Sequence, residues 1–93
     1  MASSGSEGRN GRRSHIHSPE YDALRKALAE GMQAKGIGQR ELSRKLGKPS
    51  VYVNRILGAR RTIEFGEFIE LCDGIGIDPA NILEAAMRDA GRR

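Results

Sequence analysis

Four side chains within six residues carry groups that can read the edges of DNA base pairs. An arginine can donate a fork of hydrogen bonds to guanine, an asparagine can pair with adenine, a serine suits several bases, and a valine can contact the thymine methyl group. For Arg55 taken alone, a surface salt bridge to an acid of a later helix is the alternative. We predict base contacts for Ser50, Val51, Asn54 and Arg55.

Basic residues surround these four side chains. Residues 36–61 contain seven Lys and Arg and one acid, a net charge of +6, whereas the whole chain carries +4 and residues 62–93 carry −4. This segregation indicates a positive face suited to a polyanion and a negative rear. An exposed cation taken singly is commonly only a solvated charge. As a group, we predict contacts to DNA phosphates for Gln39, Arg40, Arg44, Lys48, Arg60 and Arg61.

Gln39 belongs to this set because it stands at the predicted start of a helix. There, unpaired backbone N–H groups and the side-chain amide can point at one phosphate together. A surface glutamine without a ligand is the alternative.

The apolar spacing around these residues predicts two short helices joined by a turn. Leu42 and Leu46 are four apart, glycine and proline interrupt the pattern at 47–49, and apolar residues then resume three apart. This order is typical of a helix-turn-helix, which we place at about 38–57.

The second of these helices, predicted at about 49–57, should carry the reading side chains. Val53 and Ile56 would face inward, which turns the opposite face outward toward a major groove. Ser43 is small enough to let this helix approach the preceding one closely; an exposed helix serine is the alternative.

One predicted helix precedes the helix-turn-helix. Ser18 can cap it, Pro19 suits its first position, and Gly36 ends it near Lys35. Arg25, Lys26 and Glu30 lie off its apolar stripe and are predicted to be solvated. The predicted core stripe is Tyr21, Leu24, Leu28 and Met32.

Two more helices follow. Glu64 should open the fourth, whose predicted core stripe is Phe65, Phe68, Ile69 and Cys72. Asp78 and Pro79 should begin the last helix as cap and first residue. Its apolar face either completes the core or docks on a second copy of the chain, through Ile82, Leu83, Ala86 and Met87.

Composition predicts one all-α domain. The chain has 93 residues, four aromatic residues and no Trp, which favours a small helical bundle at 18–90. Residues 1–17 are predicted to be a disordered basic tail of Ser, Gly and Arg; its arginines are either a DNA-binding arm or part of a solvated leader. The single cysteine and the lack of a long apolar run predict a soluble cytoplasmic protein without a membrane span.

Residues 37–47 and 53–59 resemble the lambda-repressor-like helix-turn-helix family of phage repressors and bacterial regulators, including XRE-type proteins. The family pattern is similar to Leu-Ser-Gln-x-x-Leu-Ala-x-x-Leu-Gly followed by a turn and a second helix. The resemblance extends over about 20–85 and implies a compact five-helix fold. It also implies that Ser50, Val51 and Arg55 occupy positions where family members commonly touch bases, with Asn54 beside them.

One paired departure from the family pattern supports the alignment. Family members often have Arg where this chain has Met32 and Glu where it has Leu57, joined as an internal ion pair. Replacing both charges by apolar residues avoids leaving one charge buried alone. We therefore expect Met32 and Leu57 to touch.

Together these features predict a transcriptional regulator that binds double-stranded DNA sequence-specifically and acts as a repressor. A homodimer would read a near-palindrome, because one reading helix contacts few base pairs. The alternative is an antitoxin or another protein-interaction module, with a toxin or the transcription machinery as its partner. The chain lacks the motifs of common catalytic and metal sites, so we expect no enzymatic activity, metal or cofactor.

Overall fold

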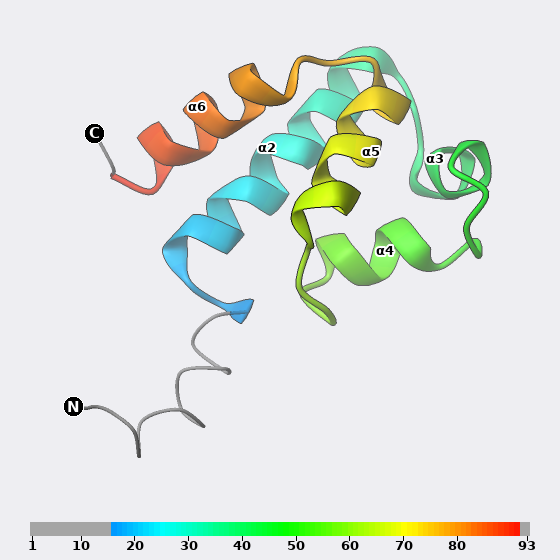
Figure 1. The fold of residues 1–93 in the computed structure, drawn as a ribbon, viewed down its shortest axis with the longest axis horizontal. Helices are drawn as coiled ribbons and strands as arrows, with labels where there is room; N and C mark the ends of the chain where they lie inside the picture. The colour runs from blue at the N-terminus through cyan, green and yellow to red at the C-terminus, as the bar shows by residue number, and fades with distance from the viewer. Residues whose placement is uncertain (1–15, 92–93) are drawn as a thin grey trace.

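The computed structural model describes residues 16–91, which contain five α-helices and no strand. The predicted tail lies outside the described residues, except for Ile16 and His17. Figure 1 shows a compact helical arrangement, and the prediction of a five-helix all-α fold is confirmed. The helices are α2 (Pro19–Lys35), α3 (Gln39–Lys45), α4 (Tyr52–Leu57), α5 (Phe65–Ile75) and α6 (Pro79–Asp89).

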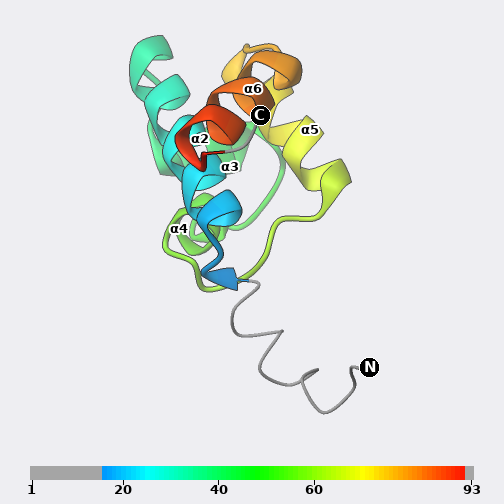
Figure 2. The same ribbon diagram turned by 90° about the vertical axis from the view of Figure 1, so that its left-hand side faces the viewer.

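Helices α2 and α6 form the most extensive helix pair of the fold, and they lie side by side in Figures 1 and 2. Ala23 and Ala27 of α2 and Ala86 of α6 are buried, and such small side chains let helix backbones approach closely. Both helices begin as predicted: the Ser18 hydroxyl accepts a hydrogen bond from the backbone of α2, and the Asp78 carboxylate accepts one from the backbone of α6.

Helix α5 packs against α3 at a glycine. A Cβ atom on Gly74 would lie 2.7 Å from Cδ1 of Leu42 and 3.0 Å from Cδ2 of Leu46. The Lys45 ammonium also donates a 2.8 Å hydrogen bond to the Gly74 carbonyl oxygen. This close approach fixes the helix-turn-helix on the rest of the bundle, because larger side chains at position 74 would push α3 away.

The core lies where these helices meet. Its fully buried large side chains include Leu28, Leu42, Ile56 and Leu71, one from each of α2 to α5. Met32 is buried in this cluster and Leu57 is partly buried against it. Cys72 is also completely buried, and burial, followed by repulsion from Asp73 and Asp78, raises the pKa of its thiol to about 11.

Two predictions about burial are wrong. Phe65, predicted in the core, is 74% exposed, because it is the first residue of α5 and projects past the edge of the bundle. Arg25, predicted to be solvated, is only 6% exposed. Its guanidinium donates to the Ile16 carbonyl oxygen at 2.7 Å, pairs with Asp22 and lies over the Tyr21 ring. These contacts offset part of the cost of burying its charge, while Nη1 is buried without a hydrogen-bond partner among the described residues.

Among the described residues, no helix is both long and apolar enough to span a membrane.

Candidate nucleic-acid interface

The two helices of the predicted helix-turn-helix are joined by one buried hydroxyl. Ser43 is completely buried; its Oγ donates to the Gln39 carbonyl oxygen at 2.9 Å and accepts from the Val53 N–H at 3.1 Å. The residue before α4, Val51, has no side chain that can cap the helix. Ser43 therefore satisfies an N–H group in the first turn of α4 from the neighbouring helix, which fixes how α4 lies against α3.

The turn between these helices is longer than predicted. Gly47 has φ +71°, a left-handed conformation that glycine adopts at little cost, and it lets the chain leave α3. The Pro49 carbonyl oxygen then accepts a hydrogen bond from the Tyr52 N–H. Helix α4 starts at Tyr52 rather than at about 49, so Ser50 and Val51 lie in the turn just before the helix.

The four predicted base-contacting residues are all exposed. Ser50 and Val51 precede α4, while Asn54 and Arg55 lie on its outer side. Val53 and Ile56 are buried as predicted, at 1% and 0% exposure, so the inner and outer sides of α4 are clearly separated. Val51 is the apolar exception at 48% exposure.

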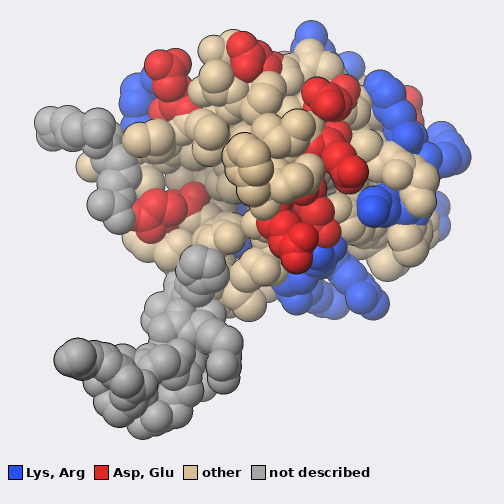
Figure 3. Space-filling view, in the orientation of Figure 1, with Lys and Arg blue, Asp and Glu red and all other residues tan. Residues whose placement is uncertain are grey.

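Three cations lie beside these four side chains. Arg40 and Arg44 of α3 and Lys48 of the turn are exposed, and with Gly47 and Ser50 they line an open depression. Figure 3 shows most Lys and Arg gathered toward the α3 side of the molecule and a band of Asp and Glu over α5, with further acids on the side of α2 and α6. We call the exposed surface of Gln39, Arg40, Arg44, Lys48, Ser50, Val51, Asn54 and Arg55 the α3–α4 face.

Gln39 and Asn54 contact each other across this face. The Asn54 side-chain amide donates a 3.0 Å hydrogen bond to Oε1 of Gln39. A residue predicted to contact phosphate and one predicted to contact bases are thus joined, which orients both amides at the start of α3 and on the outer side of α4.

The loop after α4 treats its two arginines differently. Arg60 is exposed, whereas the Arg61 guanidinium pairs with the Glu67 carboxylate at 2.6 Å and lies 5.4 Å from the centre of the Tyr52 ring. Ala59 between α4 and this pair has φ 61°, an uncommon conformation for alanine that gives the loop its sharp course. The structure therefore brings Arg61 to α4 and α5 rather than leaving its charge free.

Three residues that hold α4 and the loop after it in place were not predicted to do so. They are Tyr52, Glu67 and, for its hydroxyl, Ser43. The helix-capping role of Glu67 could be predicted from the sequence, because Glu64 and Glu67 have the spacing of a reciprocal capping box. The structure shows this capping box at the start of α5. For Tyr52 and the Ser43 hydroxyl the partners lie on other elements, so no local spacing reveals them.

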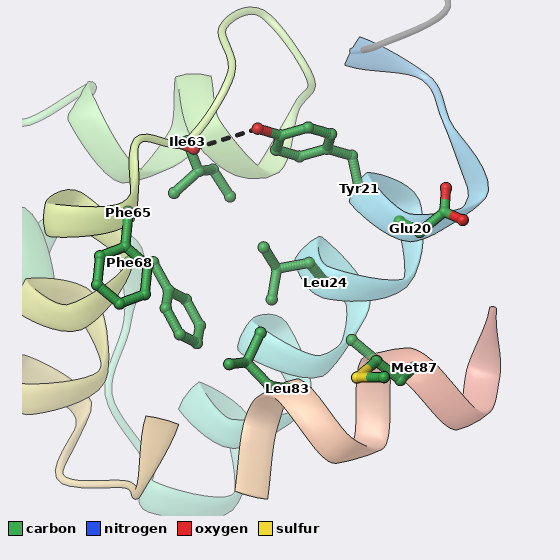
Figure 4. A pocket seen from close by; sticks show the side chains of 9 residues that line it. Glu20, Tyr21, Leu24, Ile63, Phe65, Phe68, Leu83 and Met87 are labelled. Carbon is green, nitrogen blue, oxygen red and sulfur yellow. Dashed lines mark hydrogen bonds between the residues drawn. The ribbon is translucent and has the colours of Figure 1, made fainter. Parts of the chain in front are cut away.

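An apolar groove lies on a different part of the surface, between the start of α2, the start of α5 and α6. Figure 4 shows Leu24, Phe68, Leu83 and Met87 pointing into it, with Phe65 at its rim. Leu83 and Met87 are 40% and 46% exposed. The hydroxyl of Tyr21 donates to the Ile63 carbonyl oxygen at 3.3 Å at one end. We call this feature the apolar groove.

Two helices joined by a glycine turn, with the second helix exposing polar residues beside cations, define a helix-turn-helix domain of the kind found in regulators. A comparison with solved structures agrees. An XRE-family like protein from Pseudomonas syringae pv. tomato str. DC3000 is 36% identical to this chain, with a TM-score of 0.73. The match covers 84% of this chain and 95% of that one. No protein-family model and no curated protein matched.

The chain therefore belongs to the XRE-type helix-turn-helix family. This confirms the resemblance seen in residues 37–47 and 53–59.

Proposed function

We propose that the protein is a sequence-specific transcriptional regulator, acting as a repressor, that binds double-stranded DNA with the start of α4 in the major groove. The observation that carries this proposal is the α3–α4 face. Ser50, Val51, Asn54 and Arg55 are exposed together and beside cations, while the inner side of α4 is buried. Hydrogen-bonding side chains would read base edges, and the surrounding cations would hold the phosphates.

The depression beside Ser50 supports the division between the two kinds of contact. Arg40, Arg44 and Lys48 line it, so a phosphate placed there would meet three positive side chains next to the reading residues. Such a regulator would act in the cytoplasm, on the nucleoid of a bacterium or on phage DNA. Its activity is binding, without a chemical step.

A second copy of the chain is the proposed partner at the apolar groove. The same patch holds a protruding aromatic ring, Phe65, and a hollow lined by Leu24, Phe68 and Met87. A two-fold axis brings identical patches together, so each ring could enter the other copy's hollow. Two α4 helices about 34 Å apart would then read the two halves of a near-palindromic operator.

A protein-interaction role is the second candidate, and the apolar groove is the observation that favours it. An antitoxin or a factor that contacts the transcription machinery could cover Phe65, Leu83 and Met87 with another protein. The two candidates differ in the behaviour of the purified chain. Light scattering should find a dimer in solution or on DNA for the regulator, and a monomer under both conditions would favour the second candidate.

Duplex binding measured over a range of salt concentrations tests the main proposal. About six phosphate contacts give a slope near −5 in a plot of log affinity against log salt. The control is Lys26→Ala, which removes an exposed cation of α2 that pairs with Asp89 and lies outside the α3–α4 face. Lys26→Ala should leave the slope unchanged. A slope near zero for the unmodified protein would refute DNA binding, whereas a shallower slope for Lys26→Ala would mean that the interface includes this part of α2.

Selection of bound duplexes from a random pool tests the reading of sequence. The proposal expects an enriched near-palindrome with half-sites about one helical turn apart. Recovery of unenriched sequences with the same affinity would show binding without sequence choice.

A further inference from the structure

Arg60 and Arg61 are neighbours in the sequence, yet their side chains have different surroundings. The Arg60 side chain is exposed and makes no hydrogen bond or ion pair to the residues that the structure describes. The Arg61 side chain is 36% exposed and is bound to the Glu67 carboxylate at 2.6 Å. Charge alone predicted the same phosphate-binding role for both residues, but these contacts separate them.

Glu67 is itself held in place. Its Oε1 accepts a 3.1 Å hydrogen bond from the backbone N–H of Glu64, which closes the capping box of α5, while its Oε2 accepts from Arg61. Its side chain is only 18% exposed. The carboxylate that binds Arg61 is therefore anchored to the first turn of a helix, and an anchored carboxylate holds its partner at a lower entropic cost than a free one.

Tyr52 receives Arg61 on one face of its ring. The Arg61 guanidinium lies 5.4 Å from the ring centre, and the Lys48 ammonium also lies 5.4 Å from it. Tyr52 is the first residue of α4 and is 9% exposed. Tyr52 is also part of the hydrophobic core, so Arg61 adds one further contact to the residue that begins the reading helix, and loss of Arg61 would remove that contact.

Electrostatics agree with this arrangement. The hydrogen bond from Arg61 to Glu67 raises the pKa of the Arg61 guanidinium. Burial alone would raise the pKa of Glu67, but the bonds from Glu64 and Arg61 outweigh it and the pKa is lowered. Both shifts favour the charged pair.

We propose that Arg61 is a positioning residue for α4, held between Glu67 and Tyr52, and that Arg60 rather than Arg61 supplies the phosphate contact of this loop. The part of this inference that concerns DNA rests on the proposed DNA-binding function. The internal part, the Glu67–Arg61–Tyr52 unit, concerns the free protein.

Two adjacent substitutions test the DNA part by fluorescence anisotropy on a preferred and a scrambled duplex. Arg60→Ala should make the salt slope shallower by about 0.9 for each phosphate contact removed and weaken both duplexes alike. Arg61→Ala should leave the slope unchanged and reduce the preference for the preferred duplex several-fold, because α4 loses its support. A shallower slope for Arg61→Ala would overturn the inference.

A double-substitution cycle on the free protein tests the internal part. Glu67→Ala also removes the α5 cap, but that loss is the same with or without Arg61, so the cycle isolates the pair. Arg61→Ala should lower the melting temperature and speed amide exchange of residues 52–57 relative to α6. Adding Arg61→Ala to Glu67→Ala should change little. Additive melting shifts, or unchanged exchange in α4, would overturn the proposed unit.

The two measurements also separate the two proposals. If the unmodified protein shows no salt-dependent duplex binding, the proposed function fails while the cycle still decides the positioning role. If duplex binding is present and the cycle shows no coupling, the positioning role fails alone.

Discussion

The α3–α4 face and the apolar groove are both exposed surfaces of one helical bundle, but they leave opposite kinds of side chain outside the core. The first exposes hydroxyl, amide and guanidinium groups beside three cations. The second exposes Phe65, Leu83 and Met87. A polar ligand such as DNA suits the first surface and a protein suits the second, so the two surfaces can be altered separately.

The largest separable effect is expected at Arg55. Arg55→Ala should weaken binding to the preferred duplex by about 2 kcal/mol, roughly thirtyfold, through loss of a bidentate base contact. The melting temperature should stay the same because the side chain is exposed. Anisotropy on preferred and scrambled duplexes measures this change, and an equal loss on both would assign Arg55 to the phosphate backbone.

A matched pair of substitutions should act on one surface each. Phe65→Ser should raise the dissociation constant of the dimer by about tenfold, or about 1.4 kcal/mol. Val51→Ser, also at an exposed apolar side chain, should leave the dimer unchanged and affect only DNA binding. Sedimentation equilibrium measures the self-association of both variants. If Phe65→Ser left self-association intact, the apolar groove would not be the dimer surface.

A smaller effect on stability is expected where α3 supports α4. Ser43→Ala removes the oxygen that accepts from the Val53 N–H, so the folded state should lose about 1 kcal/mol, as for the loss of a helix cap. Chemical denaturation measures this loss. Ser43→Thr is the control, since it keeps the hydroxyl, although its extra methyl group must fit. No change for Ser43→Ala would mean that another group satisfies this N–H.

The smallest predicted effect depends on pH. The pKa of Glu67 is lowered in the folded protein, so its stabilising contribution is complete above the ordinary pKa of 4.5 and is lost as pH falls through the lower folded value. The difference in melting temperature between the unmodified protein and Glu67→Gln should therefore be constant above about pH 5 and shrink below it. A difference that grew in acid would reverse the sign of the shift.

Local signals predicted where α2 and α6 begin, because the caps of these two helices are local. Ser18 and Asp78 each accept a hydrogen bond from the backbone two or three residues later, so sequence spacing alone reveals both. The buried side of α4 was also predictable from the sequence, because Val53 and Ile56 recur at helical spacing.

Predictions of burial that relied on the spacing of apolar residues alone were less successful. Phe65 fits the apolar spacing of α5, yet it stands at the helix start, beyond the reach of the core. Arg25 appears polar in the pattern, but the Ile16 carbonyl oxygen and the Tyr21 ring make its burial possible. The base and phosphate contacts remain predictions. For Arg61, only the arrangement of Tyr52 and Glu67 gives a reason to revise the role.

The single thiol of the chain has a practical consequence. Cys72 is completely buried in α5, and its pKa of about 11 leaves few reactive thiolates at neutral pH. A thiol reagent can therefore modify it only when the bundle opens. The rate of modification would therefore measure how often the bundle opens around Cys72, and no engineered label is needed for this measurement.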